Sequence, residues 1–86
     1  MRRHTISPGA ARAIVDVVAN VTGVPACAIL GRCRQPQIAR ARHMTYLAMY
    51  ARGASFETIG RLMQRDHSTV LHGVRRARQS LEAMAL

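Results

Sequence analysis

The sequence predicts an all-α fold, a compact helical bundle that contains a helix-turn-helix. Apolar residues recur at spacings of three and four, and no alternating strand pattern interrupts them. Ser, Asp and Pro residues suited to helix starts, and Gly residues suited to helix ends, divide the chain into short periodic segments. The last two segments are a short helix and a long one joined by a tight turn, which is the helix-turn-helix arrangement.

Length and composition indicate one small domain. The chain has 86 residues, of which 49% are hydrophobic and 3% aromatic, so its core must be built from Ala, Val, Ile, Leu and Met. No apolar run approaches the roughly 20 residues that span a bilayer. The stretch from Thr5 to Asp16 carries Pro, Gly, Arg and Asp, which excludes a signal peptide. We therefore expect a cytoplasmic protein.

The chain divides into a basic N-terminal arm, residues 1–6, and a domain over residues 7–86. Ser7 is suited to cap the first helix, Pro8 to occupy its first turn, and Gly23 to end it. Its apolar residues at helical spacing are Ala11, Ile14, Val15, Val18 and Val21.

Two further helices are predicted in the middle of the chain. Pro25 begins a short helix that Gly31 ends, and a basic loop over residues 31–35 follows. Pro36 then begins a helix that runs to about Arg52. The expected apolar stripe of this helix is Ala41, Met44, Leu47, Ala48 and Ala51.

This stripe predicts different positions for the polar residues of the middle helix. Arg42 and Tyr46 lie opposite it, so we expect both to be exposed and to contact DNA phosphates. Arg40 falls within about 40° of the stripe at 100° per residue. A buried arginine needs a partner, which Glu57 or Asp66 would provide. We therefore expect Arg40 to tether the helix-turn-helix to the middle helix.

The helix-turn-helix begins at Ser55, a capping residue, and turns at Gln64-Arg65. Asp66 is suited to cap the last helix. The core stripe expected for the short helix is Phe56, Ile59, Leu62 and Met63, and for the long helix Val70, Val74, Ala77, Leu81 and Met84. The polar side of the long helix holds Ser68, His72, Arg75, Gln79 and, at its edge, Arg76.

The charge is strongly positive. Thirteen arginines and no lysine face four acids, for a net charge of +9. Guanidinium suits bidentate contacts to phosphate and guanine, although a GC-rich genome would also favour arginine. The excess indicates a polyanionic partner. An anionic membrane would want one helix with a wide apolar face and a basic face, and no segment fits.

The start of the last helix carries side chains suited to reading DNA bases, namely Asp66, His67, Ser68 and Thr69. His and Thr hydrogen-bond bases, and the Thr methyl packs on thymine. The free N–H groups of the helix end also favour a phosphate. Two alternatives stay open: Asp66 either caps the helix or accepts from a base amino group, and Thr69 either reads bases or supports the cap and the packing.

Other basic residues are candidates for contacts outside the major groove. Arg32 and Arg34 on the basic loop either reach an adjacent minor groove or are solvated. Arg65 is expected on the DNA backbone. His72 either contacts that backbone or packs against the neighbouring helix.

Catalytic, metal and cofactor roles are not expected. Cys27 and Cys33 lack the spacing of a zinc site, and we expect two unpaired thiols, with Cys27 buried. No Ser/His/Asp set or paired carboxylates suggest an enzyme or a small-molecule substrate. Asp66, His67 and Ser68 are adjacent on a helix and point in different directions, which argues against a triad.

Several motifs together resemble the C-terminal box-binding domain of the bacterial replication initiator DnaA, its domain IV. They are Arg40-Ala41-Arg42-His43-Met44, Ile59-Gly60, Arg65 to Val70, Leu71-His72 and Arg75-Arg76. The resemblance implies that Arg34 enters the minor groove and that Arg42 contacts the DNA backbone. It also implies that Asp66 to Thr69 read bases and that Arg75 and Arg76 bind phosphate.

The resemblance leaves the biological role open. The initiator also has an ATPase with a Gly-Lys-Thr phosphate loop, and this chain has no lysine. Because the chain starts with Met and runs straight into the domain, we expect the double-stranded-DNA-binding domain of a transcription regulator. Further domains or RNA polymerase machinery would lie outside the chain. The alternatives are the origin-binding domain of a replication initiator and an adaptor whose arginine face docks an acidic protein.

Overall fold

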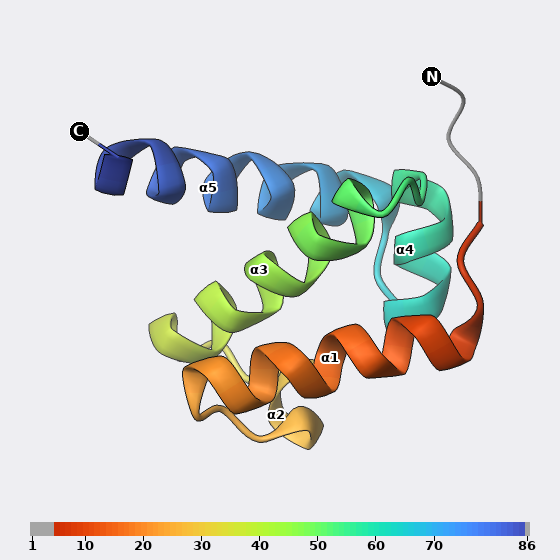
Figure 1. Ribbon diagram of the computed structural model, residues 1–86, viewed down its shortest axis with the longest axis horizontal. Helices are drawn as coiled ribbons and strands as arrows, with labels where there is room; N and C mark the ends of the chain where they lie inside the picture. The colour runs from red at the N-terminus through yellow and green to blue at the C-terminus, as the bar shows by residue number, and fades with distance from the viewer. Residues whose placement is uncertain (1–4, 86) are drawn as a thin grey trace.

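The computed structural model describes residues 5–85 and confirms the all-α prediction (Figure 1). Within these residues the helices are α1 (Pro8–Thr22), α2 (Ala26–Leu30), α3 (Pro36–Ala51), α4 (Phe56–Met63) and α5 (His67–Ala85). Most of the basic arm expected over residues 1–6 lies outside the described residues. In the part that is described, no helix is long and apolar enough to cross a membrane.

Helix α3 is the centre of the fold. It runs diagonally between α1 and α5 and packs on both (Figure 1). The short helix α2 packs on α1 and α3, while α4 packs mainly on α5. Since α3 has neighbours on two sides, more than one of its faces is buried.

The helix boundaries follow the local signals in the sequence. Ser7 caps α1, its hydroxyl oxygen accepting a hydrogen bond from the Ala10 N–H at 3.1 Å. Gly23 ends the helix with φ of 76°, a left-handed conformation that glycine adopts without strain. Ser55 caps α4 by accepting from the Thr58 N–H at 3.2 Å. These predicted helix ends are confirmed.

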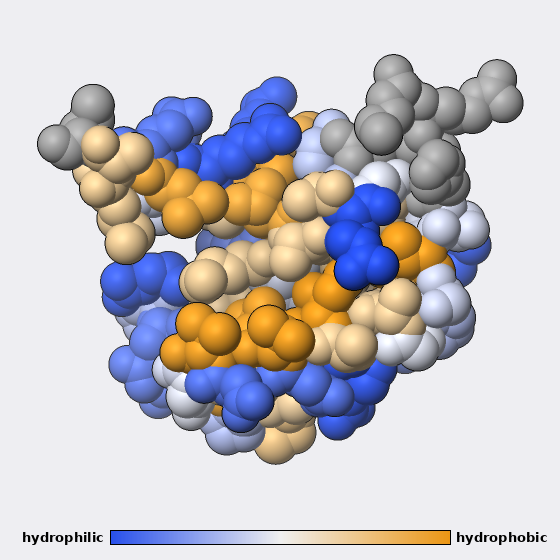
Figure 2. Space-filling model, in the orientation of Figure 1, coloured by the Kyte–Doolittle hydropathy of each residue, from blue (hydrophilic) through white to orange (hydrophobic). Residues whose placement is uncertain are grey.

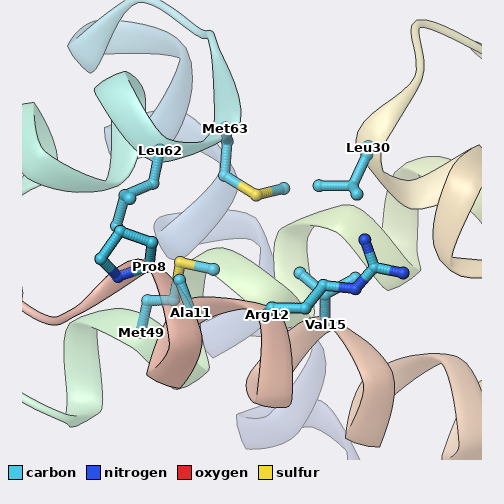
Figure 3. A pocket seen from close by; sticks show the side chains of 8 residues that line it. All are labelled: Pro8, Ala11, Arg12, Val15, Leu30, Met49, Leu62 and Met63. Atoms are coloured by element: carbon cyan, nitrogen blue, oxygen red, sulfur yellow. The ribbon is translucent and has the colours of Figure 1, made fainter.

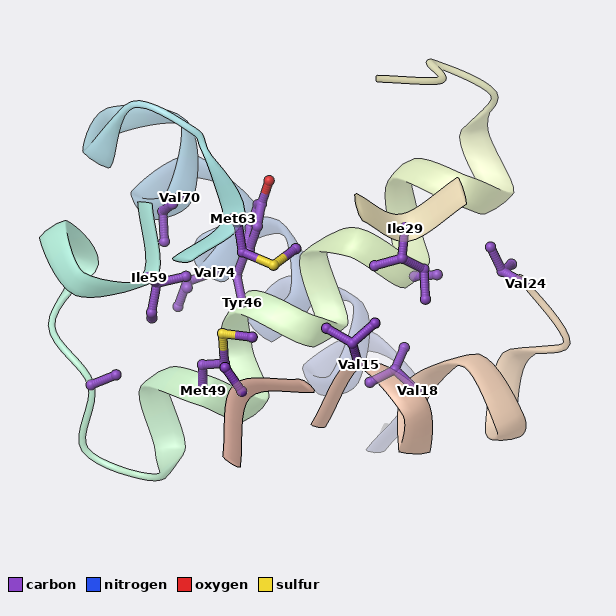
Figure 4. Close-up of a cluster of buried hydrophobic side chains, with 13 residues drawn as sticks. Val15, Val18, Val24, Ile29, Tyr46, Met49, Ile59, Met63, Val70 and Val74 are labelled. Atoms are coloured by element: carbon purple, nitrogen blue, oxygen red, sulfur yellow. The ribbon is translucent and has the colours of Figure 1, made fainter. Parts of the chain in front are cut away.

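The core lies where α3 meets the other helices (Figure 4). Its largest fully buried side chains are Val15, Ile29, Thr45, Tyr46, Met49, Ile59, Val70 and Val74. The expected stripes were too long, because Val21 is 73%, Leu81 53% and Met84 81% exposed. Residues 78–85 of α5 are exposed throughout, since this part of the helix extends past the helices that cover its first half (Figure 1).

The predicted buried side of α3 was only partly right: Ala41 is buried and Leu47 packs against the core, but the rest of the stripe is displaced. The buried residues of α3 are Ala41, Arg42, Thr45, Tyr46 and Met49. The expected Met44 and Ala51 are exposed. The stripe was chosen for its apolar residues, whereas contact with helices on two sides turns Arg42 and Tyr46 inward.

A glycine on α5 explains how Tyr46 is accommodated. Gly73 is buried, and a Cβ atom built there would lie 2.5 Å from Cδ2 of the Tyr46 ring. The ring therefore occupies the space that any larger residue on α5 would need. This contact brings α3 and α5 close together where Tyr46 meets Gly73.

His43, beside this α3–α5 contact, is expected to make the stability of the fold depend on pH. Burial lowers the pKa of His43 below its ordinary value of 6.5, and the charges of Arg76 and Arg42 lower it further. The unfolded chain therefore binds this proton at a higher pH than the folded chain, so stability rises with pH through the window just below that ordinary value. We expect the free energy of unfolding to fall between about pH 7.5 and about pH 5, and to fall less in His43→Gln.

Urea unfolding at the two pH values measures this difference. His72→Gln is the matched control, because His72 is exposed on α5. It should keep the wild-type pH dependence. An equal fall in wild type and His43→Gln would remove His43 as the cause.

Both cysteines are free and exposed. The expectation that Cys27 is buried was wrong. Within the short α2 the buried residue is Ile29, two positions further along, so Cys27 lies on a different side of the helix.

Candidate nucleic-acid interface

The turn between α4 and α5 is tight and closed by the backbone. Gln64 takes a left-handed conformation with φ of 56°. The Arg65 N–H donates to the Gly60 carbonyl at 2.7 Å. This turn joins the two helices of the helix-turn-helix as the sequence predicted, and it sets the direction in which α5 begins.

Asp66 caps α5. Its Oδ2 accepts from the Ser68 N–H at 3.1 Å and from the Ser68 hydroxyl, and its carbonyl accepts from the Val70 N–H at 3.2 Å. The hydrogen bond from the Ser68 hydroxyl and, to a smaller extent, the one from the Ser68 N–H hold the pKa of Asp66 below its ordinary value. The capping role left open by the sequence is therefore present in the free protein.

The front end of α5 is open to solvent. Asp66, His67, Ser68 and Thr69 are all exposed, and Val70 is the first buried residue of the helix. The backbone N–H groups and polar side chains at this end are therefore accessible to a ligand. A helix end of this kind is the part of a helix-turn-helix that enters a major groove.

The exposed side of α5 continues this surface. His72, Arg75 and Arg76 are exposed, and in Figure 2 hydrophilic side chains line α5 along the upper edge of the molecule. The alternative that His72 packs into the neighbouring helix is therefore wrong. Arginines about two turns behind the front end lie at the right place to meet phosphates on a groove's edge.

Arg42 is not the exposed phosphate contact that the sequence predicted. It is only 8% exposed. Its Nε donates to the Ile29 carbonyl at 2.8 Å, Nη1 to that of Cys33 at 3.0 Å and Nη2 to that of Ala28 at 2.9 Å. Each of its three nitrogens thus serves a backbone carbonyl of the fold, which explains how a charged residue is buried here.

The tethering role predicted for Arg40 was wrong. Arg40 is exposed, and its Nε donates to the Pro36 carbonyl of its own helix at 3.4 Å. Neither Glu57 nor Asp66 pairs with it among the described residues. The error has the same origin as the error over the α3 stripe, because the buried side of α3 carries Arg42 instead.

Tyr46 is also buried, at 1% exposure, so the predicted phosphate contact does not fit the structure. Burial raises the pKa of its hydroxyl, an effect that the charges of Arg65 and Arg42 partly oppose. Arg65 lies close enough to interact with this hydroxyl, but within the described residues no hydrogen bond of normal geometry reaches its oxygen.

Tyr46→Phe tests this correction. Removing a buried hydroxyl that lacks a well-formed hydrogen bond should raise the free energy of unfolding by about 1 kcal/mol, measured in urea. Affinity for duplex DNA, measured in parallel, should stay the same. A weaker affinity for duplex DNA would mean that the hydroxyl reaches a phosphate after all.

Arg65 is half-buried, and its guanidinium group donates hydrogen bonds to backbone carbonyls of the turn. Its Nη1 donates to the Met63 carbonyl at 2.9 Å and to that of Gln64 at 3.2 Å, and its Nη2 donates to the Gly31 carbonyl. These internal bonds compete with the DNA-backbone contact that we expected for Arg65. They also place the basic loop directly beside the helix-turn-helix turn.

The basic loop, residues 31–35, presents Arg32 and Arg34 to solvent. Its carbonyls at Gly31 and Cys33 are held by Arg65 and Arg42. The fold thus brings an arginine-bearing loop and the open end of α5 together, although more than 30 residues separate them in sequence.

The pockets of the molecule lie elsewhere. The one in Figure 3 is lined by apolar side chains from α1 to α4, with Arg12 at its side paired to Asp16 at 3.2 Å. A second hollow lies between α1 and α3. Neither is lined by the residues predicted to bind DNA, and within residues 5–85 no three His, Cys, Asp or Glu side chains gather as a metal site. The candidate site is therefore an open basic surface.

A short helix, a tight turn and a longer helix with an open, polar front end on a basic surface are the features of helix-turn-helix proteins that bind duplex DNA. Residues 11–77 match the family described as the bacterial DnaA protein helix-turn-helix, and the chain belongs to this family. The resemblance found in the sequence is thereby confirmed. Membership implies a double-stranded DNA partner and a non-catalytic domain. No solved structure matches the chain.

Proposed function

We propose that this protein binds double-stranded DNA containing a DnaA box by placing the front end of α5 in the major groove. The observation that carries the proposal is the exposure of all four residues from Asp66 to Thr69 around a capped helix end. In this arrangement Asp66 orients the helix end and remains close enough to the bases to accept from an amino group. His67, Ser68 and Thr69 present hydrogen-bonding groups to base edges.

The remaining contacts follow from exposure and charge. Arg34, with Arg32 beside it, enters the adjacent minor groove from the basic loop. His72, Arg75 and Arg76 meet phosphates along the exposed side of α5. The proposal takes residues 7–86 as the DNA-binding unit and residues 1–6 as its basic arm.

The family match favours the origin-binding role over the transcription regulator expected from the sequence. The matched family is the helix-turn-helix of DnaA itself and covers residues 11–77, including the candidate residues from Arg32 to Arg76. We therefore propose a box-binding domain of the replication-initiator type. An adaptor for an acidic protein would use the same arginines without distinguishing one duplex from another.

A binding titration separates these functions. We would compare a duplex containing a DnaA box with a duplex of the same composition and shuffled sequence, by fluorescence anisotropy from about 50 to about 200 mM salt. The proposal predicts at least about tenfold tighter binding to the box, with a log–log salt slope of about −0.9 for each phosphate neutralised. Equal binding of both duplexes would contradict the box-binding role, and no binding would favour the adaptor.

A further inference from the structure

Two arginines next to the proposed DNA surface face inward. Arg42 uses each of its guanidinium nitrogens for a different carbonyl, those of Ala28, Ile29 and Cys33, at 2.8–3.0 Å. Two of these carbonyls belong to the last turn of α2, and the third belongs to the basic loop. One side chain of α3 therefore fixes both the end of α2 and the loop that follows it.

Arg65 binds the same loop through a different carbonyl. Its Nη2 donates to the Gly31 carbonyl across 34 residues of sequence, while its Nη1 donates to the carbonyls of Met63 and Gln64 in the helix-turn-helix turn. Asp66, the next residue, caps α5. The basic loop and the front end of α5 are therefore connected through a single side chain.

The partners of these two cations are carbonyls, which has an electrostatic consequence. Carbonyls in the last turn of a helix have few backbone donors of their own, although that of Ala28 also accepts from the Gly31 N–H at 3.2 Å, so they can compensate a buried guanidinium group. Burial and, after it, the charge of Arg65 lower the pKa of Arg42, as expected for two cations held near each other. Carboxylate partners would have cancelled positive charge beside the DNA surface, whereas carbonyls leave it in place.

We propose that Arg42 and Arg65 are positioning residues that hold the basic loop in register with α5, so that the minor-groove and major-groove contacts form together. This inference rests on the proposed function. A loop that is already ordered loses less conformational entropy on binding, so the contact made by Arg34 contributes more to affinity. Direct phosphate contact by Arg42, which the family resemblance implied, is the rival explanation.

The first test needs no DNA. Arg42→Lys and Arg65→Lys keep the charge but replace the planar guanidinium with a single ammonium that cannot serve separate carbonyls. Trypsin cleavage after Arg32 and Arg34, followed by mass spectrometry, should become about tenfold faster in both variants, because the loop opens more often. Cleavage after Arg75 and Arg76 should not change.

Arg40→Lys is the matched control, because Arg40 is exposed on the same helix and bonds only within it. In the Arg40→Lys protein the basic loop should be cleaved at the wild-type rate. Should Arg42→Lys be cleaved everywhere because it unfolds, Arg65→Lys still tests the loop. Unchanged loop cleavage in a folded Arg42→Lys or Arg65→Lys protein would overturn the positioning role, whatever the DNA results are.

The second test is a double-mutant cycle on the box duplex. Arg34→Ala should weaken binding by about tenfold in the wild type and by less than about twofold in Arg42→Lys, because a released loop no longer places Arg34. Arg75→Ala should cost the same in both backgrounds. Additive effects of Arg34→Ala and Arg42→Lys would overturn the proposal. If the wild type shows no preference for the box, the proposed function fails while the cleavage result stands.

Discussion

Replacing Gly60 with alanine is expected to lower the free energy of unfolding by about 3 kcal/mol and to abolish duplex binding at concentrations where the wild type binds. A Cβ at residue 60 would lie 2.5 Å from the Arg65 carbonyl oxygen and 3.5 Å from the His67 nitrogen. Both atoms are backbone, so no side-chain rotation relieves the clash. The turn must shift, and the 2.7 Å bond from the Arg65 N–H to the Gly60 carbonyl is strained or lost.

Urea unfolding followed by circular dichroism measures this loss. Gly9→Ala is the control, because Gly9 lies in a helix and its nearest contact for a new Cβ is the Ser7 hydroxyl oxygen at 4.0 Å. It should leave stability unchanged or raise it by up to about 1 kcal/mol through better helix propensity. Wild-type stability in Gly60→Ala would mean that the turn tolerates a side chain and that its close approach is not what directs α5.

Substitutions on α5 should separate into two kinds. His67→Ala and Thr69→Ala should cost about 1–3 kcal/mol on the box duplex and little on a shuffled duplex, because they remove hydrogen bonds to particular bases. Arg75→Ala and Arg76→Ala should weaken both duplexes about equally and reduce the salt slope by about 1 each, because they remove phosphate contacts.

Affinities of both duplexes at several salt concentrations measure this separation. Arg52→Ala is the charge control, because Arg52 is exposed at the end of α3 and lines the hollow beside α1. It should change neither the preference nor the salt slope by as much as Arg75→Ala. If all the α5 variants lost affinity for both duplexes alike, the assignment of base-reading and phosphate-binding residues would be wrong.

Local features of the fold were predictable from the sequence. Helix ends depend on a few neighbouring residues, so Ser7, Ser55 and Asp66 as caps and Gly23 as an ending residue were identified correctly. The open front end of α5 followed from the same local logic, because polar residues precede the first buried position. Family membership followed from several short motifs, each of which can be read directly from neighbouring residues.

The central helix was less predictable because its environment is set by distant segments. Its buried side depends on α1 and α5 together, and on Gly73 leaving room for the Tyr46 ring. The role of Arg42 was hidden for a related reason. Its partners are backbone carbonyls 9 to 14 residues away, which no residue type marks in a sequence. A search for an acidic partner led instead to Arg40.

Selection of bound duplexes from a random pool tests most directly whether α5 reads bases. Wild type and His67→Ala would be selected side by side at one salt concentration. We expect the wild type to enrich a DnaA-box motif and His67→Ala to lose preference at one or two positions of it while keeping the rest. An identical motif for both proteins, or no motif for the wild type, would contradict the placement of the front end of α5 in the major groove.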